Sequence, residues 1–189
     1  MELPVRKNTR LAEENYVGFR FYFLTLCCFE RKRIFADAGH CKDILEILRS
    51  ECARRGFVVH AYCVMPDHLH FLCEGIEPSS DLLRLVMSFR IKSSRIFAKD
   101  GGVLWQRGYN EHILRAGDAV ESVAWYVWLN PVRQGLVLKA QEYRFAGSFT
   151  GWKMPASWGE ERWRPPWKGG ERARRNEAVR GEERSSSEG

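Results

Sequence analysis

The pattern of apolar and polar positions divides the chain into alternating strand-like and helix-like segments. Dense runs of aromatic and β-branched residues are typical of strands, and apolar residues spaced three and four apart are typical of one helix face. The predicted elements, in chain order, are a strand at 19–29, a helix at 40–56, strands at 57–64 and 68–74, a helix at 82–99, a strand with a turn at 103–115 and a helix at 119–129. The expected fold is therefore an α+β, ferredoxin-like β-α-β-β-α-β sandwich with an added C-terminal helix.

This fold class predicts how the elements lie in space. The first and third strands are expected side by side in the centre of the sheet, with both major helices on one face. One domain is expected over 1–150, beginning with a flexible lead-in at 1–18. Four of the seven tryptophans lie in 152–167, and almost no large apolar residues follow them. Residues 151–189 are therefore expected to form a Trp- and Pro-rich and then charged tail that is largely disordered.

His68 and His70 stand two apart in the third predicted strand. On a strand, residues at this spacing point to the same face with Cα atoms roughly 6.6 Å apart, so two imidazoles can converge on one metal ion. Leu69 points the other way, into the core. By itself the pair is a weak signal, because two imidazoles can share a strand face without binding a metal.

Tyr126 and Asn130 lie four apart on the added helix and share one of its faces. Taken alone, Tyr126 reads as a core aromatic and Asn130 as a helix-ending residue before Pro131. Together with the histidines, the pair indicates phosphoryl transfer, because a tyrosine hydroxyl can attack a phosphodiester that a metal ion polarises. His68, His70 and Asn130 would leave coordination positions open for phosphate and water. Such a ligand set suits Mn²⁺ better than Mg²⁺, although phosphate oxygens of a substrate compensate for Mg²⁺.

The charge of the chain favours a polyanionic partner, but only mildly. The formal net charge is +6 and the pI is about 9.1. The polar face of the helix predicted at 82–99 carries charges that are nearly all positive. Such a face is most often an ordinary solvated surface, and it is also what phosphate contacts require. The residues predicted to contact DNA are Arg90, Lys92, Arg95, Arg107 and Arg115.

The six cysteines lie mostly inside apolar segments and form no C-x-x-C pair. This distribution predicts free, buried thiols in a reducing compartment and argues against a structural zinc site. No stretch is long and apolar enough to cross a bilayer, and the polar N-terminus lacks the apolar run of a signal peptide. The expected location is the cytoplasm, with no membrane partner.

Three segments, VMPDHLH, WQRGYNEHILR and YVWLNPVRQGL, occur in this order along the chain. Together they resemble the REP-associated tyrosine transposases, which are relatives of the IS200/IS605-type single-tyrosine transposases in the HUH endonuclease group. The likeness spans residues 19–149 and does not cover the tail. It implies a ferredoxin-like fold and cleavage and rejoining of single-stranded DNA that depend on Mg²⁺ or Mn²⁺, with DNA hairpins as recognition elements.

The resemblance also implies roles for individual residues. It maps His68 and His70 onto the metal ligands of the group, Asn130 onto the third position of the metal site and Tyr126 onto the nucleophile. Cleavage would leave a 5′-phosphotyrosine and a free 3′ hydroxyl. Tyr109 is the rival nucleophile, but it lacks a partner four residues later in the chain. The resemblance leaves open whether the protein acts as a monomer or a homodimer.

Two further functions fit the same sequence. One is a DNA-hairpin-binding protein that has no cleavage activity in the cell, although the intact motifs argue against a loss of chemistry. The other is a metal-dependent hydrolase that uses the two histidines while Tyr126 is structural. A purely structural metal protein fits least well, because too few ligands are visible for a closed site.

Overall fold

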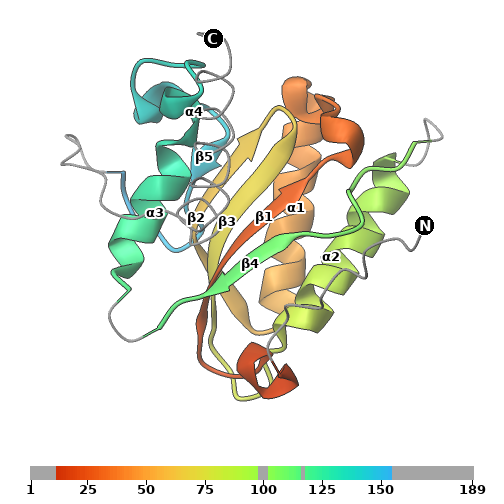
Figure 1. The fold of residues 1–189 in the computed structure, drawn as a ribbon, viewed down its shortest axis with the longest axis vertical. Helices are drawn as coiled ribbons and strands as arrows, with labels where there is room; N and C mark the ends of the chain where they lie inside the picture. The colour runs from red at the N-terminus through yellow and green to blue at the C-terminus, as the bar shows by residue number, and fades with distance from the viewer. Residues whose placement is uncertain (1–11, 98–101, 116–117, 155–189) are drawn as a thin grey trace, which may run out of the picture.

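The computed structural model describes residues 12–97, 102–115 and 118–154. In these ranges five strands form one antiparallel sheet, with the order β4-β1-β3-β2-β5 (Figure 1). The strands are β1 (Phe21–Cys27), β2 (Phe57–Met65), β3 (His68–Gly75), β4 (Asn110–Ile113) and β5 (Ala146–Gly147). The first four strands have the ferredoxin-like order, so the predicted central pair of β1 and β3 is confirmed.

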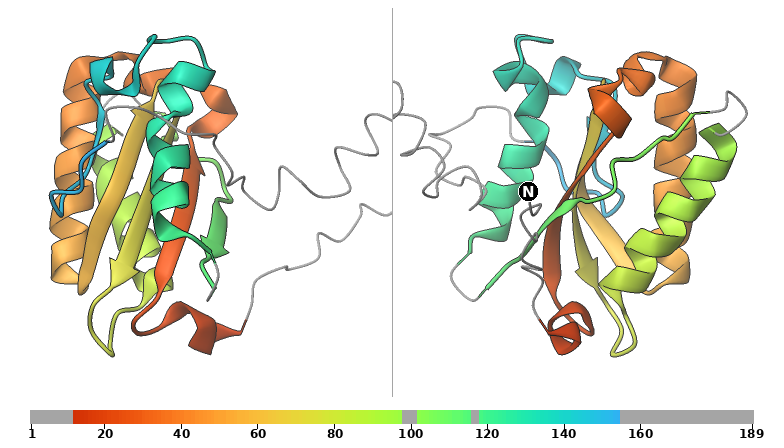
Figure 2. Two further views of the ribbon diagram at one scale, coloured as in Figure 1. Left: turned by 90° about the vertical axis from the view of Figure 1, so that its left-hand side faces the viewer. Right: turned by 45° about the vertical axis from the view of Figure 1, so that its right-hand side comes forward.

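The helices cover both faces of this sheet. They are α1 (Ala38–Arg54), α2 (Leu82–Phe97), α3 (Val120–Trp128) and the single turn α4 (Asn130–Arg133). Short 3₁₀ turns lie at η1 (Glu13–Tyr16), η2 (Phe29–Arg31), η3 (Ile34–Ala36) and η5 (Ala140–Glu142). The two long helices α1 and α2 lie together on one face, as predicted, and α3 lies on the other (Figures 1 and 2).

Strand alternation produces two separate cores, one on each side of the sheet. On β1, Tyr22 and Leu24 point toward α1 and α2, while Phe23 points toward α3. All three side chains are fully buried. Because the central strands are covered on both faces, they read as nearly continuous apolar runs in the sequence. Polar side chains on their α3 face, such as His70, are therefore exceptions to the pattern.

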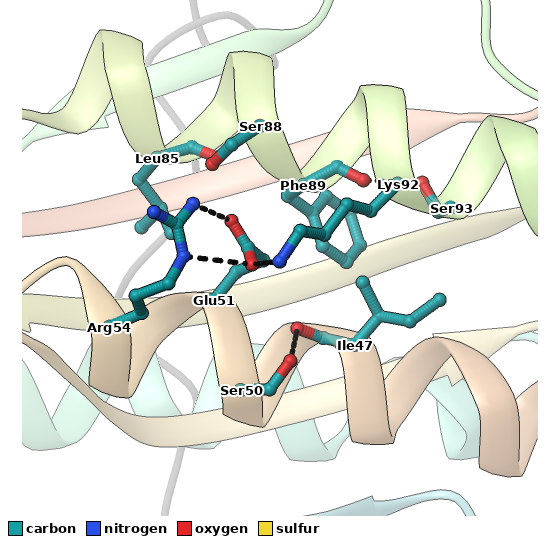
Figure 3. A network of polar contacts seen from close by, with 9 residues as sticks. All are labelled: Ile47, Ser50, Glu51, Arg54, Leu85, Ser88, Phe89, Lys92 and Ser93. Carbon is teal, nitrogen blue, oxygen red and sulfur yellow. Dashed lines mark hydrogen bonds and ion pairs between the residues drawn. The ribbon is translucent and has the colours of Figure 1, made fainter.

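An ion-pair network around the buried Glu51 joins α1 to α2 (Figure 3). The Glu51 side chain is completely buried and accepts hydrogen bonds from Arg54 at 3.2 and 2.6 Å and from Lys92 of α2. Burial alone would raise the pKa of Glu51, but hydrogen bonds from Arg54, Lys92 and Ser88 outweigh burial and lower the pKa to about 2. The network holds the two long helices together across the core that they share.

The C-terminal part of the described chain forms a strap along the edge of β2. β5 pairs with β2, and the indole Nε1 of Trp128 donates to the Gly147 carbonyl at 2.8 Å. A Cβ at position 147 would lie only 2.8 Å from the Tyr62 hydroxyl oxygen, so any larger residue there would require the Tyr62 ring to shift. Trp152 continues the strap, with its ring centroid 4.6 Å from that of His60. The tail predicted to be disordered lies mostly outside the described residues, at 155–189.

Several local predictions were wrong. The flexible lead-in does not extend over 12–18, where Tyr16 is buried in the core and Val17 bridges to Asp81. The predicted strand at 103–109 is reduced to one bridge between Cys28 and Trp105. Asp118 directly precedes the helix predicted at 119–129 and is a residue type that favours the N-cap position. Its carboxylate instead accepts a hydrogen bond from the Arg115 main-chain N–H, and Ala119 is the N-cap residue of α3.

Two other predictions on composition can be compared with the structure. All six cysteines are free and buried, as expected. In the described ranges, no helix is both long enough and apolar enough to cross a membrane.

Candidate active site

The two histidines lie at the start of β3, directly after the turn that connects it to β2. His68 and His70 point to the same face of the sheet, and their Nε2 atoms are 3.0 Å apart. Their rings meet nearly perpendicularly, with centroids 4.6 Å apart. The convergence predicted from the strand spacing is therefore present in the structure.

Each imidazole is oriented by a second polar group. Nδ1 of His68 lies 2.5 Å from Oδ1 of Asp67, and Nδ1 of His70 lies 2.7 Å from the hydroxyl of Thr25 on β1. Burial would raise the pKa of Asp67, but its hydrogen bond to His68 and the charges of His68 and Arg31 outweigh burial and lower it. The Asp67 carboxylate therefore accepts, and His68 Nδ1 donates. Partners of this kind fix the tautomer and ring orientation of metal-binding histidines.

The geometry of the pair fits a divalent cation. When both Nδ1 atoms donate outward, the lone pairs of both Nε2 atoms are directed toward the same space. Two ligands at neighbouring positions of an octahedral ion with bonds of about 2.1 Å lie about 3.0 Å apart, as the two Nε2 atoms do. Among the described residues, no cluster of three His, Cys, Asp or Glu side chains forms a metal site. Further ligands would therefore be amide, phosphate or water oxygens.

α3 brings Tyr126 to the same face of the sheet. Its ring packs edge-on against Phe23, with centroids 5.6 Å apart, and against His70, with centroids 6.2 Å apart. Tyr126 is only 3% exposed, because α3 buries one apolar side against β1, β2 and β3. The reading of Tyr126 as a core aromatic is thus correct for its ring, but the ring also lies beside the histidine pair.

Asn130 and Arg133 close the end of α3. Pro131 has no N–H to donate to the carbonyl of Val127, so the helix cannot continue regularly. Instead, Nδ2 of Asn130 donates to the carbonyls of Tyr126 at 3.0 Å and Val127 at 3.3 Å. The guanidinium of Arg133 donates to the Tyr126 carbonyl at 2.5 Å and lies over the Tyr126 ring, 4.1 Å from its centroid. α3 thus ends slightly before the predicted position, and Asn130 begins α4.

One cavity contains all four predicted site residues. It has a volume of about 610 Å³, and its lining includes His68, His70, Tyr126 and Asn130. Because Nδ2 of Asn130 is held by main-chain carbonyls, Oδ1 is the atom of this amide that faces a prospective ligand. Tyr109 lines a different cavity of about 710 Å³, beside α2.

Comparison with known proteins places the chain in a family. The sequence model described as "Transposase IS200 like" matches residues 20–128, more than half of the chain. This protein belongs to the IS200-like transposase family.

Individual relatives are similar to this chain over most of their length. A candidate REP-associated tyrosine transposase of Haemophilus influenzae is 21% identical, over 73% of this chain and 86% of the relative. An uncharacterised protein of the same organism is 25% identical, over 67% of this chain and 88% of the relative. The solved structure of a REP-associated tyrosine transposase bound to a REP hairpin has a TM-score of 0.64 at 17% identity, covering 85% of this chain and 99% of that one. The structural likeness shows that the fold is shared.

The five residues predicted to contact DNA have different surroundings in this IS200-like transposase. Arg95, Arg107 and Arg115 are exposed. Arg90 donates to the main-chain carbonyls of Gln106 and Arg107, and Lys92 is paired with Glu51. Contact with DNA stays a prediction for all five, but Arg90 and Lys92 also have structural roles that the sequence pattern did not reveal.

Sequence reasoning missed several residues of the site. Thr25, Asp67 and Arg133 support the predicted ligands and the predicted nucleophile, and Arg31 and Arg33 also line the cavity. Asp67 adjoins the histidine pair and was detectable from its neighbourhood in the sequence. Thr25 faces His70 only because of the β1–β3 register, in which the two residues are directly opposite.

Proposed function

We propose that this IS200-like transposase is a metal-dependent single-strand DNA endonuclease and transposase that cleaves and rejoins DNA near hairpin elements through a 5′-phosphotyrosine intermediate. Tyr126 is the nucleophile, and His68, His70 and Asn130 are the metal ligands. The divalent ion is Mg²⁺ or Mn²⁺. The observation that carries the proposal is the shared cavity, because the predicted nucleophile and predicted ligands line it together although they come from different parts of the chain.

The position of Tyr126 favours it over Tyr109. Tyr126 lies beside His70 on the metal-binding face of the sheet, whereas Tyr109 lines the cavity next to α2. A nucleophile must reach the same phosphate that the metal ligands address, so a shared cavity is the first geometric requirement. The alternative of a hydrolase with a structural Tyr126 assigns no chemical purpose to its place beside the histidines.

The proposed reaction is a transesterification. The phenol oxygen of Tyr126 bonds to the scissile phosphorus, and the bond between phosphorus and the 3′ oxygen breaks. Tyrosine loses one proton and the departing 3′ oxygen gains one, so the step needs no external co-reactant. A second strand with a free 3′ hydroxyl can reverse the step and rejoin DNA, because the energy of the phosphodiester is retained in the phosphotyrosine.

The residues of the chain prepare this reaction. A divalent ion held by His68, His70 and Asn130 would polarise the phosphate and stabilise charge on the leaving oxygen. Asp67 and Thr25 keep the two imidazoles in the required orientation. Arg133 and Phe23 contact the Tyr126 ring and limit its movement.

The proposed partner is single-stranded DNA with a hairpin. The structural relative is described as bound to a REP hairpin, and the net charge of +6 is compatible with a polyanionic ligand. We propose that the protein acts in the cytoplasm, as a monomer or a homodimer, without a membrane partner.

The experiment uses end-labelled hairpin DNA from the flanks of the gene, incubated with the full-length protein and Mn²⁺ or Mg²⁺. A denaturing gel then resolves any covalent protein–DNA adduct. We expect an adduct with the wild type and with Tyr109→Phe, and none with Tyr126→Phe. Loss of the adduct only in Tyr109→Phe would overturn the site but keep the reaction class. Tight binding without any adduct would support the hairpin-binding protein, and cleavage that survives in Tyr126→Phe would support the metal hydrolase.

A further inference from the structure

The segment after β1 contributes two residues to the lining of the cavity that holds the predicted site, and it has an unusual conformation. Glu30 and Arg31 both have positive φ angles, of 53° and 56°. Residues with side chains adopt this left-handed region rarely and at a cost in energy, and single occurrences are much commoner than two in succession. Strain of this kind is retained where the surrounding structure requires a particular placement of side chains.

The ends of this segment are fixed to the turn that precedes the two histidines. The main-chain N–H of Cys28 donates to the Asp67 carbonyl, and that of Phe35 donates to the Pro66 carbonyl, both at 2.9 Å. Phe29 N–H also donates to the Leu104 carbonyl at 2.9 Å. The segment is therefore held in a defined position relative to the beginning of β3.

The three consecutive basic residues of this segment, Arg31, Lys32 and Arg33, have different surroundings. Arg31 and Arg33 line the catalytic cavity, together with the histidine pair. Lys32, which lies between them, is not part of the lining, and its ammonium group contacts the Phe29 ring and lies 3.6 Å from the Glu30 carboxylate. Two basic side chains therefore line the cavity, and the basic side chain between them in the sequence lies outside it.

We propose that Arg31 and Arg33 form a binding site for backbone phosphates of the single DNA strand that enters the catalytic cavity. The proposal deepens the function given above and rests on it, because it assigns the substrate contacts of the same cavity. The two arginines would hold phosphates beside the scissile one, so that the scissile phosphate lies between the histidine pair and Tyr126.

The chemistry of both side chains suits this role. A guanidinium presents a planar set of donors that matches phosphate oxygens, and Arg31 and Arg33 are exposed residues that line the cavity. Arg31 makes an ion pair with Asp67 at 3.2 Å, but its side chain is 55% exposed, and pairs of this kind are weak. A phosphate can therefore replace Asp67 as the partner of Arg31, while Asp67 keeps its hydrogen bond to His68 Nδ1.

The test measures binding of a fluorescent hairpin oligonucleotide with single-stranded flanks to the full-length protein, without divalent metal, over a range of KCl concentrations. The variants are Arg31→Gln, Arg33→Gln and the matched control Lys32→Gln, each checked for an unchanged thermal unfolding midpoint. We expect each arginine variant to bind the oligonucleotide about tenfold more weakly than the wild type at low salt. The slope of the logarithm of the association constant against the logarithm of the salt concentration should be smaller by about 0.7. Lys32→Gln is expected to change affinity less than about twofold, as a screened surface charge.

A chemical change in the DNA separates direct contact from a structural effect. Methylphosphonate linkages, which carry no charge, are introduced one at a time along the flank. At the contacted position, the methylphosphonate should weaken binding by the wild type and remove the difference between the wild type and the arginine variant. The proposal would be overturned if the losses of affinity from the methylphosphonate and from the arginine substitution simply added at every position. It would also be overturned if Lys32→Gln weakened binding as much as the arginine variants do.

The outcome is independent of the covalent reaction. A protein that forms the adduct but is insensitive to Arg31→Gln and Arg33→Gln would retain its proposed function and lose this phosphate site. A protein that never forms an adduct but shows coupling between an arginine and one phosphate would lose the proposed function and retain the site.

Discussion

The Nε2 atoms of His68 and His70 lie 3.0 Å apart, although their rings are held by different parts of the chain. Asp67 of the preceding turn orients the first ring, and Thr25 of the neighbouring strand orients the second. Convergence therefore depends on the tight β2–β3 turn and on the β1–β3 register together. The two proposed metal ligands are therefore brought together by the fold of the chain itself.

Metal binding is expected to stabilise the protein through this pair. Because an ion that binds only the folded state raises the free energy of unfolding, Mn²⁺ should raise the thermal unfolding midpoint of the wild type. The shift should be lost in His68→Ala and in His70→Ala, and it should persist in His112→Ala, whose imidazole lies near Asp118. An equal Mn²⁺-dependent shift in all four proteins would contradict the assignment of the ligands.

Thr25→Val tests the support of His70. Valine has nearly the shape of threonine but cannot hydrogen-bond Nδ1, so the ring loses its orientation while the strand is retained. Loss of such a partner weakens metal affinity by about 10- to 100-fold. A calorimetric titration with Mn²⁺ should show this decrease in metal affinity. The Thr25→Ser variant, which keeps a hydroxyl, should bind Mn²⁺ as the wild type does. Wild-type affinity in Thr25→Val would show that the hydroxyl has no role in metal binding.

Asn130→Asp should separate stability from metal binding. The carboxylate would face the carbonyls of Tyr126 and Val127, which now receive hydrogen bonds from Nδ2, and this change should lower the free energy of unfolding by about 1–3 kcal/mol. The added negative charge should at the same time strengthen Mn²⁺ binding if Oδ1 is a ligand. Denaturant unfolding and Mn²⁺ titration measure the two effects. Weaker metal binding in Asn130→Asp would place Asn130 outside the metal site.

The lowered pKa of Glu51 predicts how the free energy of unfolding depends on pH. Its pKa of about 2 in the folded protein lies below the ordinary value of 4.5. A lowered carboxyl pKa stabilises the fold above pH 4.5, and this stabilisation is lost as the pH falls from 4.5 toward 2. At neutral pH this carboxylate contributes about 3 kcal/mol to the free energy of unfolding. About 2 kcal/mol of this contribution is lost when the pH reaches about 3.

Comparison with Glu51→Gln isolates this contribution from those of other carboxyl groups. The variant keeps the shape of the side chain but cannot carry the charge that pairs with Arg54 and Lys92. In urea unfolding, the difference between wild type and variant should therefore be large at neutral pH and small in acid. A difference that does not change with pH would contradict the ion-pair account.

The order of elements and the central strand pair were predictable because apolar periodicity reports burial directly. The same signal placed His68 and His70 on one face. Interactions between distant segments were not predictable in this way. The Tyr16 side chain is buried by residues that follow it much later in the chain, so its polar neighbours in the sequence made 12–18 resemble a flexible segment.

The charged residues show more clearly that contacts between distant segments cannot be predicted from the local sequence pattern. Lys92 has the sequence context of a solvated or DNA-binding cation, but it pairs with the buried Glu51 of another helix. Arg31 and Arg33 look like a charged break after a strand, and only the left-handed turn at Glu30 and Arg31 brings them to the cavity. Charge patterns along one segment cannot reveal partners that tertiary packing supplies.

The most direct measurement is the identity of the residue that carries DNA after the reaction. Trypsin cleaves after arginine, so the rival nucleophiles fall on separate peptides, with Tyr109 in residues 108–115 and Tyr126 in residues 116–133. The adduct would be digested with nuclease and trypsin and analysed by tandem mass spectrometry. We expect a 5′-phosphonucleotide on Tyr126 within 116–133. A nucleotide on Tyr109, or on any residue other than Tyr126, would contradict the proposed mechanism.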